Sequence, residues 1–351
     1  MLHGSPTVPR LHALGGLFTG YTATLPAAHQ SPARRSSAGA GTLDGLRRTA
    51  AASGVRIPAL LNISAIGLAG RTGESRDLTN CDVPLAVDTI QRHRDLIRGL
   101  KVRIDHETVG SHGVEPLRRA LDAASACGVP VMVHIGTSPP LLSEVLDLLR
   151  PGDIVTHCAS GLASPLGPVD RGVLLDLGHG SGGFSFDVLE RQLDLGLAPH
   201  TISTDLHCRS LAGPVFDLPT TMAKLLAVGV PLTEVLHAVT EQPARTLGLP
   251  GGTLEVGAPA DLAVFDVRDE EHQVVDSQRQ TRTAPVRLVN VATYIGGRRL
   301  PPRFPAPPPP WAPLTPARSA IRSRWSRPPA PASTRPSASA STCATSPTSP
   351  R

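Results

Sequence analysis

VPVMVHIG at residues 129–136, followed by GDIVTHCASG at residues 152–161, decides the fold class of this chain. Each stretch holds a short apolar run bounded by Gly or Pro, which is typical of a strand buried on both faces. Each run ends on a histidine, His134 in the first and His157 in the second. Helix-like sequence separates the two runs, so the pattern predicts an α/β fold with a parallel sheet covered by helices.

Two further runs of the same kind end on or contain residues that can bind a metal ion. GLKVRID at residues 99–105 carries Lys101, and TISTDLH at residues 201–207 carries Asp205. Polar residues at the carboxyl ends of successive parallel strands predict the TIM-barrel form of an α/β fold, with an active site at that mouth. Each residue taken alone has a plainer interpretation, as a charged residue at a strand edge or a histidine in the barrel core.

The rest of the body predicts the same alternation of strands and helices. Strands are expected at 56–64, 100–104, 131–135, 154–157, 173–177 and 201–205, and helices at 114–127, 140–149, 186–195, 217–228 and 232–247. Gly128 and Gly196 directly follow the ends of two of these helices, as is usual at a helix C-terminus.

Lysine is rare in this chain. It occurs only at Lys101 and Lys224, so 32 of the 34 basic residues are arginine. Arginine cannot lose its proton, whereas a buried lysine can become a neutral amine. A neutral amine can react with carbon dioxide to form a carbamate, whose oxygens can bridge two metal ions. The other three strand-end residues favour this interpretation of Lys101 over that of an ordinary charged residue.

The basic charge of the chain comes from its C-terminal stretch. The formal net charge is +5, but residues 301–351 hold seven arginines and no Asp or Glu, which leaves −2 (5 − 7) for the rest. The body therefore gives no reason to expect a nucleic-acid surface. The same stretch holds 15 of the 36 prolines. We expect it to be disordered, because it cannot bury enough apolar surface to offset its ordering entropy.

Cysteine usage and hydropathy favour a cytoplasmic protein. Five irregularly spaced cysteines predict reduced thiols (Cys81, Cys127, Cys158, Cys208 and Cys343). No apolar run approaches the ~20 residues that span a membrane, and His, Pro, Arg and Gly interrupt the N-terminus where a signal peptide would stand. We interpret Cys158 and Cys208 first as small residues at the barrel mouth, with a role as metal ligands as the alternative. The expected partner is a small-molecule substrate, with no nucleic acid and no membrane, and a homo-oligomer stays open.

From about residue 37 to residue 299 the chain resembles the amidohydrolase superfamily of metal-dependent TIM-barrel hydrolases, and within it the deacetylase-like members related to dihydroorotase. Besides the four runs above, LLNISAIGLAG at 60–70 and LLDLGHGSGGFSF at 174–186 carry the resemblance. EQPARTLGLPGGTLEVGAPADLAVFDV at 241–267 is similar to the last barrel helix running into the small β domain of the superfamily. ATYIGGRRL at 292–300 is similar to the closing strand of that domain.

The resemblance implies roles for the strand-end residues. Lys101 corresponds to a lysine that is carboxylated in many relatives and bridges two metals. His134 and His157 correspond to histidines of the second metal site. Asp205 corresponds to an aspartate that binds the first metal and acts as acid and base. One or two zinc ions, held through N6-carboxylated Lys101, are implied, and other divalent metals also suit these ligands. A metal-activated hydroxide would then attack the substrate while Asp205 moves protons.

Four further residues are candidates for contact with substrate: His179, Ser181, Arg103 and His207. His179 and Ser181 lie in GHGSGG at 178–183, which lacks the Lys-Ser/Thr ending of a phosphate-binding loop. We therefore expect a flexible loop on the substrate side of the barrel. The plainer interpretation is that these side chains line the mouth or cap a strand without touching substrate.

One element of the family pattern is missing from the sequence. The resemblance implies a His-x-His pair at the end of the first barrel strand, yet no His-x-His occurs anywhere in the chain. Residues 1–36 do not resemble the family and show neither opening strands for the β domain nor a clear first barrel strand. A shifted reading frame or genuine divergence would each produce this break. The first metal would keep only Asp205 and the carbamate unless His3 or His12 substitutes, so we expect weak activity and poor stability.

These observations predict four parts: a non-family segment (1–36), a TIM barrel incomplete at strand 1 (37–248), the C-terminal part of a small β domain (249–300) and a disordered tail (301–351). The expected function is metal-dependent hydrolysis of an amide, cyclic amides included, or of an acetyl-type ester. The alternative is a catalytically impaired remnant, a one-metal or metal-free barrel with a binding or structural role. The sequence leaves the substrate open, because substrate choice depends on the site rather than on the fold.

Overall fold

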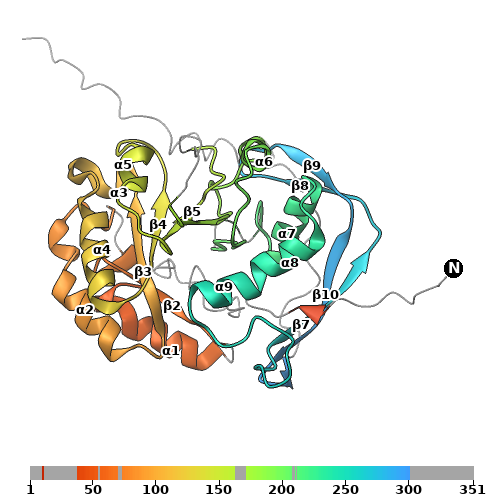
Figure 1. Ribbon diagram of the computed structural model, residues 1–351, viewed down its shortest axis with the longest axis horizontal. Helices are drawn as coiled ribbons and strands as arrows, with labels where there is room; N and C mark the ends of the chain where they lie inside the picture. The colour runs from red at the N-terminus through yellow and green to blue at the C-terminus, as the bar shows by residue number, and fades with distance from the viewer. Residues whose placement is uncertain are drawn as a thin grey trace, which may run out of the picture. The chain divides into compact units, whose positions relative to one another are not determined.

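The computed structural model describes residues 10–11, 38–53, 56–69, 73–162, 171–207, 210 and 212–300. All of them belong to one compact unit (Figure 1). The predicted disordered tail, 301–351, and all but two residues of the predicted non-family segment, 1–36, lie outside the described residues, as do His3, His12, Cys208 and Cys343.

The unit is built around a parallel five-stranded sheet. Its strands run in the order β2 (Ala59–Asn62), β3 (Ile97–Ile104), β4 (Val131–Ile135), β5 (Ile154–Thr156) and β6 (Leu174–Asp176). A single parallel bridge extends the sheet at each edge, from Gly39 to Asn62 and from Asp176 to Thr201. Sequential parallel strands with helical crossovers form the wall of a TIM barrel, as the sequence predicts. The bridge at Thr201 and the bridge at Gly39 mark the two edges of this wall. Among the described residues, no further strand of the sheet closes the gap between these edges.

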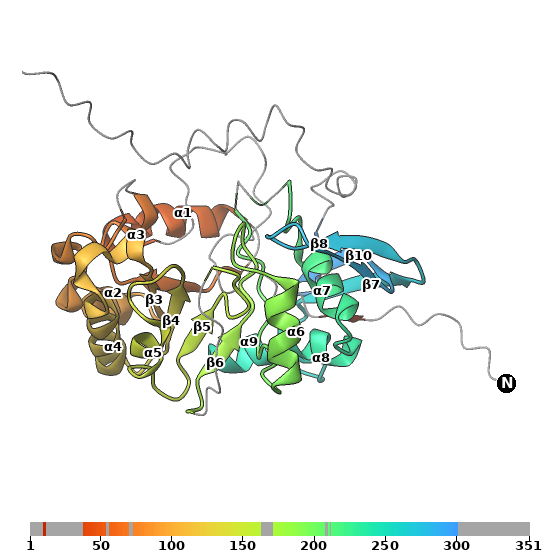
Figure 2. The same cartoon turned by 90° about the horizontal axis from the view of Figure 1, so that it is seen from above.

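Helices alternate with these strands and continue after β6. They are α1 (Leu43–Ser53), α2 (Val83–Arg92), α3 (His106–Val109), α4 (Glu115–Cys127), α5 (Leu142–Leu146), α6 (Phe186–Asp194), α7 (Leu218–Ala227), α8 (Leu232–Val239) and α9 (Glu241–Thr246). Figures 1 and 2 show α2 and α4 outside β3 and β4. Pro116 lies in the first turn of α4, and Gly128 ends the helix in the left-handed conformation at φ 65°. The chain then enters β4 as predicted.

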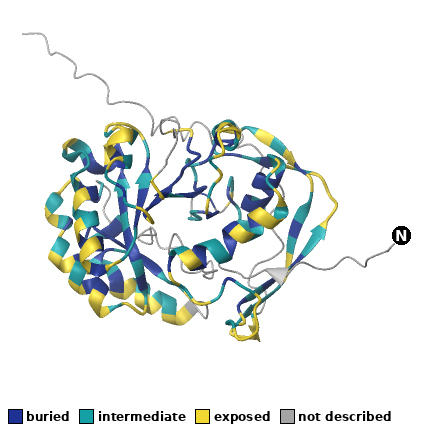
Figure 3. Ribbon diagram, viewed as in Figure 1, coloured by how far each residue is buried: buried dark blue, intermediate teal, exposed yellow. Residues whose placement is uncertain are grey.

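The alternation of side chains along the strands separates an outer and an inner surface. Leu100, Val102 and Ile104 of β3 belong to the large apolar core that the helices share. Figure 3 shows buried residues gathered along the strands of the sheet and along the helix faces turned toward them. Lys101 and Arg103 therefore lie on the opposite face, inside the barrel. This arrangement explains how one short strand carries both the core and the candidate site.

A small apolar cluster fills the bottom of the barrel interior. It consists of buried Leu60, Met132, Ile154 and Leu247. Met132 lies beside Ile154 in the register of β4 and β5, so these side chains form one layer. His134 and Thr156 lie two residues further toward the carboxyl ends, above this apolar layer, whereas Lys101 lies at the level of Met132.

A second, antiparallel sheet follows the barrel in sequence. It has the strand order β1 (Arg10–Leu11), β7 (Leu262–Arg268), β10 (Arg287–Ile295) and β11 (Arg298–Arg299). This sheet stands where the small β domain is expected, and the segment expected as its closing strand, 292–300, forms the end of β10, a turn and β11. One expectation was wrong: the N-terminal segment does supply a short strand, because Arg10 pairs with Val264 and Leu11 with Ala263 of β7.

A hairpin of β8 (His272–Val275) and β9 (Thr281–Ala284) packs on α7. Figure 2 shows β8 beside α7. The turn between these strands holds Asp276, which is buried and accepts a 2.9 Å hydrogen bond from the backbone N–H of Phe186 at the start of α6. The hairpin is thereby tied to the barrel next to the loop that follows β6.

Three of the sequence-based boundaries differ most from the structure. The expected strand 201–205 is only the bridge at Thr201, because the N–H of Ile202 donates to the carbonyl of Ala238 in α8 and the chain turns at Asp205, where φ is 42°. The expected helix 232–247 is two helices, since Thr240 leaves helical geometry at φ −124° and ψ −81°. The expected helix 140–149 shortens to α5. None of the helices in the described ranges is long and apolar enough to cross a membrane.

Candidate metal-binding active site

A row of polar residues crosses the inner face of the sheet near its carboxyl end. Arg103 pairs with His134 in the strand register, His134 with Thr156, Thr156 with Asp176, and Asp176 with Thr201. Because residues paired in a parallel sheet project to the same face, these side chains line the same level of the barrel mouth. His157 directly follows Thr156 in the sequence, and Asp205 comes four residues after Thr201.

Lys101 lies one pleat deeper than this row, at the level of Met132. Its Nζ atom is buried and has no hydrogen-bond partner among the described residues. Burial lowers the pKa of Lys101 to about 7, although the nearby carboxylate of Asp205 acts to raise it, and Arg103 lowers it further. A substantial part of the Lys101 population is therefore a neutral amine near neutral pH. Asp205, Asp176 and Glu74 all lie close enough to act on its charge.

His134 and His157 pack edge to face, with ring centroids 4.5 Å apart and ring planes at 83°. Burial lowers the pKa of His134 to about 4, against the raising effect of its bond to Asp105, and burial lowers that of His157 well below its ordinary value. Both rings are therefore neutral at pH 7, which is the form that binds metal ions.

The protein anchors a different nitrogen on each ring. His134 Nε2 lies 3.5 Å from Asp105 Oδ2, so a neutral His134 donates there and keeps its lone pair on Nδ1. His157 Nδ1 donates to the carbonyl of Gly178 and keeps its lone pair on Nε2. A carboxylate or carbonyl behind a histidine is the usual means of fixing the tautomer of a metal ligand.

His157 and Asp205 both have left-handed backbone geometry, with φ of 65° and 42°. Non-glycine residues seldom adopt this conformation, and it concentrates at functional sites. Next to Asp205, Gly180 comes so near that a Cβ atom on it would lie 2.6 Å from Asp205 Oδ2. The backbone of the 178–183 loop therefore forms part of the wall around the Asp205 carboxylate.

Asp176 is a site residue that the sequence reasoning missed. It is fully buried, and its carboxylate accepts hydrogen bonds of 2.7–2.8 Å from the hydroxyls of Thr156, Thr201 and Ser203. Burial raises its pKa in spite of these three bonds. A signal was present, because Asp176 is a carboxylate at the end of the apolar run 173–177, as Asp205 is at the end of its own run.

Arg103 is held by acidic neighbours. It lies 3.3 Å from Glu74 Oε2 and 3.4 Å from Asp105 Oδ2. Asp105 also accepts hydrogen bonds from the N–H and hydroxyl of Thr108 at the start of α3. Burial acts to raise the pKa of Asp105, but the bonds from His134 and Thr108 hold it well below its ordinary value. A chain of contacts thus runs from Glu74 through Arg103 and Asp105 to His134.

The other substrate candidates lie in two loops. His179 is fully buried, and both its ring nitrogens have protein partners, Gly180 O at Nδ1 and Lys224 Nζ at Nε2. In this conformation neither nitrogen is open to a substrate. Ser181 is partly exposed in the same loop. His207 is partly exposed, and its N–H donates to the hydroxyl of Ser210.

The donor set suits a metal ion only if Lys101 is carboxylated. In the described part of the chain, no group of three or more His, Cys, Asp or Glu residues could hold a metal ion. Cys158 does not add a ligand, because burial raises the pKa of its thiol and disfavours the thiolate. Two imidazoles and a carbamate on Lys101 would give the three protein ligands of an open zinc site. The buried, unpartnered Nζ of Lys101 fits that modification.

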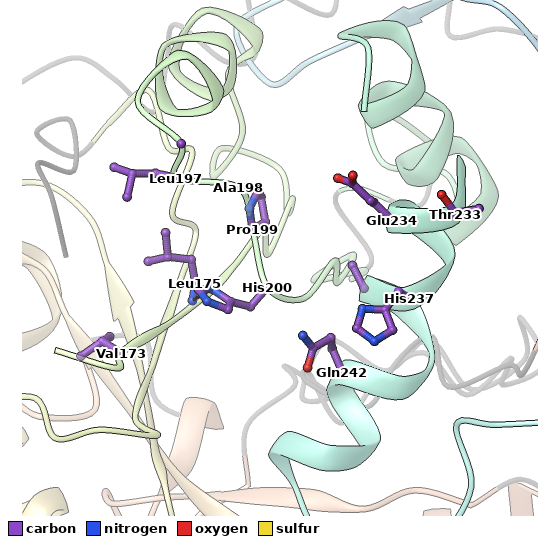
Figure 4. A pocket seen from close by; sticks show the side chains of 12 residues that line it. Val173, Leu175, Leu197, Ala198, Pro199, His200, Thr233, Glu234, His237 and Gln242 are labelled. Atoms are coloured by element: carbon purple, nitrogen blue, oxygen red, sulfur yellow. Dashed lines mark hydrogen bonds between the residues drawn. The ribbon is translucent and has the colours of Figure 1, made fainter. Parts of the chain in front are cut away.

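A cavity of about 630 Å³ lies elsewhere, at the amino end of β6. Figure 4 shows His200 on one side of it and Glu234 and His237 of α8 on the other. Val173 lines this cavity, whereas Asp176, at the other end of β6, belongs to the polar row. The cavity is therefore separate from the candidate site.

Known proteins resemble this chain over most of the described residues. The Amidohydrolase family model matches residues 227–301. A deacetylase of Brucella anthropi is 40% identical over 63% of this chain, which spans 59% of that protein. A deacetylase of Enterococcus faecalis is 36% identical, with 68% of this chain and 69% of that protein covered. The crystal structure of a dihydroorotase is 34% identical, with a TM-score of 0.75, and the match covers 84% of this chain and 88% of that one.

These matches agree with the strand order and the polar row described above. Two of them, the Enterococcus deacetylase and the dihydroorotase structure, exceed 30% identity while most of the other protein is covered. The matched part nevertheless spans less than two thirds of the Brucella relative. On sequence and fold together, the chain belongs to the amidohydrolase superfamily.

Proposed function

We propose that the chain is a metal-dependent hydrolase that cleaves an acetyl-type amide or ester bond. The observation that carries this proposal is the Lys101 amine, which is buried, has no hydrogen-bond partner in the described part of the chain, and lies within electrostatic reach of His157 and Asp205. An unpaired buried amine is costly unless it is modified or bound to something. The deacetylase names of the relatives above supply the expected bond type.

Lys101, His134 and His157 are the residues that would hold the metal. Carbamate oxygen and neutral imidazole are ligands that zinc favours, and other divalent ions accept them too. A divalent ion held there would lower the pKa of a water molecule and polarise the carbonyl of the substrate. Asp205 and the carbamate alone provide too few ligands for a second ion within the described residues.

The chain's own residues divide the remaining work. Asp205, beside the amine of Lys101, accepts a proton at its carboxylate and passes it to the leaving group. Asp105 holds His134 through Nε2, and the Gly178 carbonyl holds His157 through Nδ1, so each ring presents one fixed nitrogen. Arg103 at the mouth provides a guanidinium that can bind a substrate carboxylate.

A second candidate is a barrel that binds one metal ion or none and has a binding role. The absence of three His, Cys, Asp or Glu side chains in one group among the described residues favours it. It differs from the hydrolase in a measurable way, since it predicts no turnover even when the protein is loaded with metal.

Metal analysis together with hydrolysis assays separates the two candidates. The full chain, purified from cells grown with zinc and bicarbonate, is assayed on a panel of N-acetyl and O-acetyl compounds. The hydrolase predicts at least one metal ion per chain and turnover that Asp205→Asn abolishes while metal remains bound. No bound metal after zinc loading, or turnover unchanged in the Asp205→Asn variant, would overturn the hydrolase proposal.

A further inference from the structure

We propose that Lys224 and His179 form a positioning pair that holds the 178–183 loop against Asp205 and His157. Lys224 is the only lysine besides Lys101 in the chain, and it lies in α7 rather than at a strand end. The inference rests on the proposed hydrolase and adds a role for two residues that touch neither the reacting atoms nor the metal ligands.

Lys224 is fully buried and makes two specific contacts. Its Nζ lies 2.6 Å from His179 Nε2 and donates a 2.7 Å hydrogen bond to the carbonyl of Pro214. The same atom lies 6.0 Å from the centre of the Phe184 ring. A buried amine is rarely kept in an apolar core unless its hydrogen bonds are needed. The geometry places those bonds on one imidazole and one carbonyl.

The Gly180 carbonyl and Lys224 together fix the tautomer of His179. A carbonyl can only accept, so the proton of the neutral ring lies on Nδ1, and the lone pair on Nε2 accepts from the amine of Lys224. That proton is used in a 2.8 Å bond to the carbonyl of Gly180. The imidazole is therefore held at both ends, by α7 on one side and by its own loop on the other.

His179 in turn fixes the backbone of the loop. Its N–H donates to Ser203 O at 3.1 Å, the N–H of Gly180 donates to Thr204 O at 2.9 Å, and the N–H of Gly183 donates back to His179 O at 3.1 Å. Ser203 and Thr204 directly precede Asp205. The loop and the segment that carries Asp205 are thus joined by two backbone hydrogen bonds around His179.

The loop touches both functional side chains. A Cβ at Gly180 would lie 2.6 Å from Asp205 Oδ2, and a Cβ at Gly183 would lie 2.5 Å from His157 Nδ1. The carbonyl of Gly178 accepts the hydrogen bond from that same Nδ1. A shift of this backbone would therefore move the Asp205 carboxylate and release the tautomer of His157 together.

Nuclear magnetic resonance of the unmutated full chain tests the pair without any assay of turnover. With 15N-labelled histidine, His179 is expected as a single neutral tautomer, protonated on Nδ1 and accepting on Nε2, near pH 7. Amide exchange at Gly180 and Gly183 should be slow. A His179 ring protonated on Nε2, or rapid exchange in the loop, would overturn the proposal.

Lys224→Met keeps an apolar chain of similar length but removes both hydrogen bonds. We expect mixed His179 tautomers and faster exchange at Gly180 and Gly183. On the best substrate we expect kcat to fall about tenfold or more, with KM changed little, because the loop misplaces a proton-transfer group rather than a binding group. His179→Gln, which changes the same contact from the loop side, should reproduce the exchange and kcat effects if Lys224→Met folds poorly.

Leu226→Ala, in the same helix and in the apolar core, is the matched control. It loses packing without touching His179, so it should leave the tautomer, loop exchange and kcat as in the unmutated protein. Equal loop exchange in all three variants would overturn the positioning role. If the unmutated chain shows no turnover, the hydrolase proposal fails, and the tautomer and exchange results still decide whether Lys224 holds the loop.

Discussion

At the level of single residues, the candidate site is shaped by the ring nitrogen through which each histidine is held, which differs between His134 and His157. Asp105 takes Nε2 of the first ring, and the Gly178 carbonyl takes Nδ1 of the second. The free nitrogens therefore belong to different positions of the two rings, which allows two histidines on adjacent strands to face one ion. Asp105 matters here through its charge, which its contacts preserve by holding its pKa low.

Asp105→Asn should weaken zinc binding about 10–100-fold, because an amide stabilises the His134 tautomer less well than a carboxylate. Competition with a chelator at pH 7 measures the affinity. Asp77→Asn is the matched control, since Asp77 likewise caps a turn through a threonine N–H and hydroxyl but lies on the surface. Equal zinc affinities for Asp105→Asn and the unmutated chain would contradict the role given to Asp105.

Lys101 makes stability depend on pH in a defined window. Its pKa falls from an ordinary 10.5 to about 7 on folding, chiefly through burial. Between these values the unfolded chain binds a proton that the folded protein does not, so this group makes stability rise with pH across the window. The Lys101→Met variant lacks this titrating group. Its free energy of unfolding should therefore exceed that of the unmutated chain by the largest amount below pH 7.

Urea unfolding of both proteins at pH 6 and pH 9, in buffer free of metal and carbon dioxide, measures this difference. The stability advantage of Lys101→Met should be larger at pH 6 than at pH 9. Other titrating groups are common to both proteins and largely cancel in the comparison. An advantage that is the same at both pH values would show that the Lys101 pKa is not lowered in the folded protein.

At the scale of elements, the alternation of strands and helices follows from local sequence. Apolar runs bounded by Gly or Pro became β3, β4, β5 and β6, and Gly128 ended α4 in the left-handed conformation as its position predicts. The segment 201–205 did not become a strand, because Ile202 bonds to α8 instead of a neighbouring strand. The hydrophobicity of a segment indicates that the segment is buried. Whether it also forms a strand depends on which backbone groups lie beside it to make hydrogen bonds.

Asp153 joins two elements of the wall. This buried carboxylate accepts hydrogen bonds from the N–H of Val131 at the start of β4 and from both the backbone and the guanidinium of Arg150, just before β5. Asp153→Ala leaves these donors unpaired, and we expect a loss of about 3–5 kcal/mol in the free energy of unfolding, measured in urea.

Asp147→Ala provides the comparison for Asp153. Asp147 pairs with Arg171 at 3.7 Å, but both side chains are largely exposed, at 71% and 61%. Its loss should change stability by less than about 1 kcal/mol. Comparable losses in the two variants would mean that burial of Asp153 does not govern its contribution.

At the scale of the whole molecule, a metal ion at the candidate site would couple ligand binding to folding. The candidate ligands come from β3, from β4 and from the loop after β5, and Asp205 comes from the segment before α7. A metal ion bound among them would add a link between these segments. Such a ligand stabilises the folded protein according to its concentration and affinity.

Zinc at a free concentration of 100 times its Kd should add about 2.7 kcal/mol to the free energy of unfolding. His157→Ala should lose this gain. His237→Ala should keep it, because His237 lies on α8 by the separate cavity and pairs with Glu241. Thermal unfolding with and without zinc, in the presence of bicarbonate, measures both variants. Equal zinc stabilisation of His157→Ala and His237→Ala would place the bound metal elsewhere.

The sequence by itself determined the barrel class and the placement of Lys101, His134 and His157 on or directly after its strands, because hydrophobic runs and punctuating Gly and Pro act locally. Asp205 follows only a single bridge at Thr201. The polar residues Lys101, His134 and His157 were predictable for the same reason: each sits on or directly after such a run. Asp176 was open to the same argument and was overlooked.

Only the tertiary structure decided which partners these residues have. Asp105 behind His134, the Gly178 carbonyl behind His157 and Lys224 behind His179 are contacts between segments far apart in the chain, two of them across 21 and 45 positions. No local pattern encodes such contacts, since they depend on how strands and helices pack. Protonation and tautomer are set by burial and by these partners, so the chemistry of the site became visible only when the chain was folded.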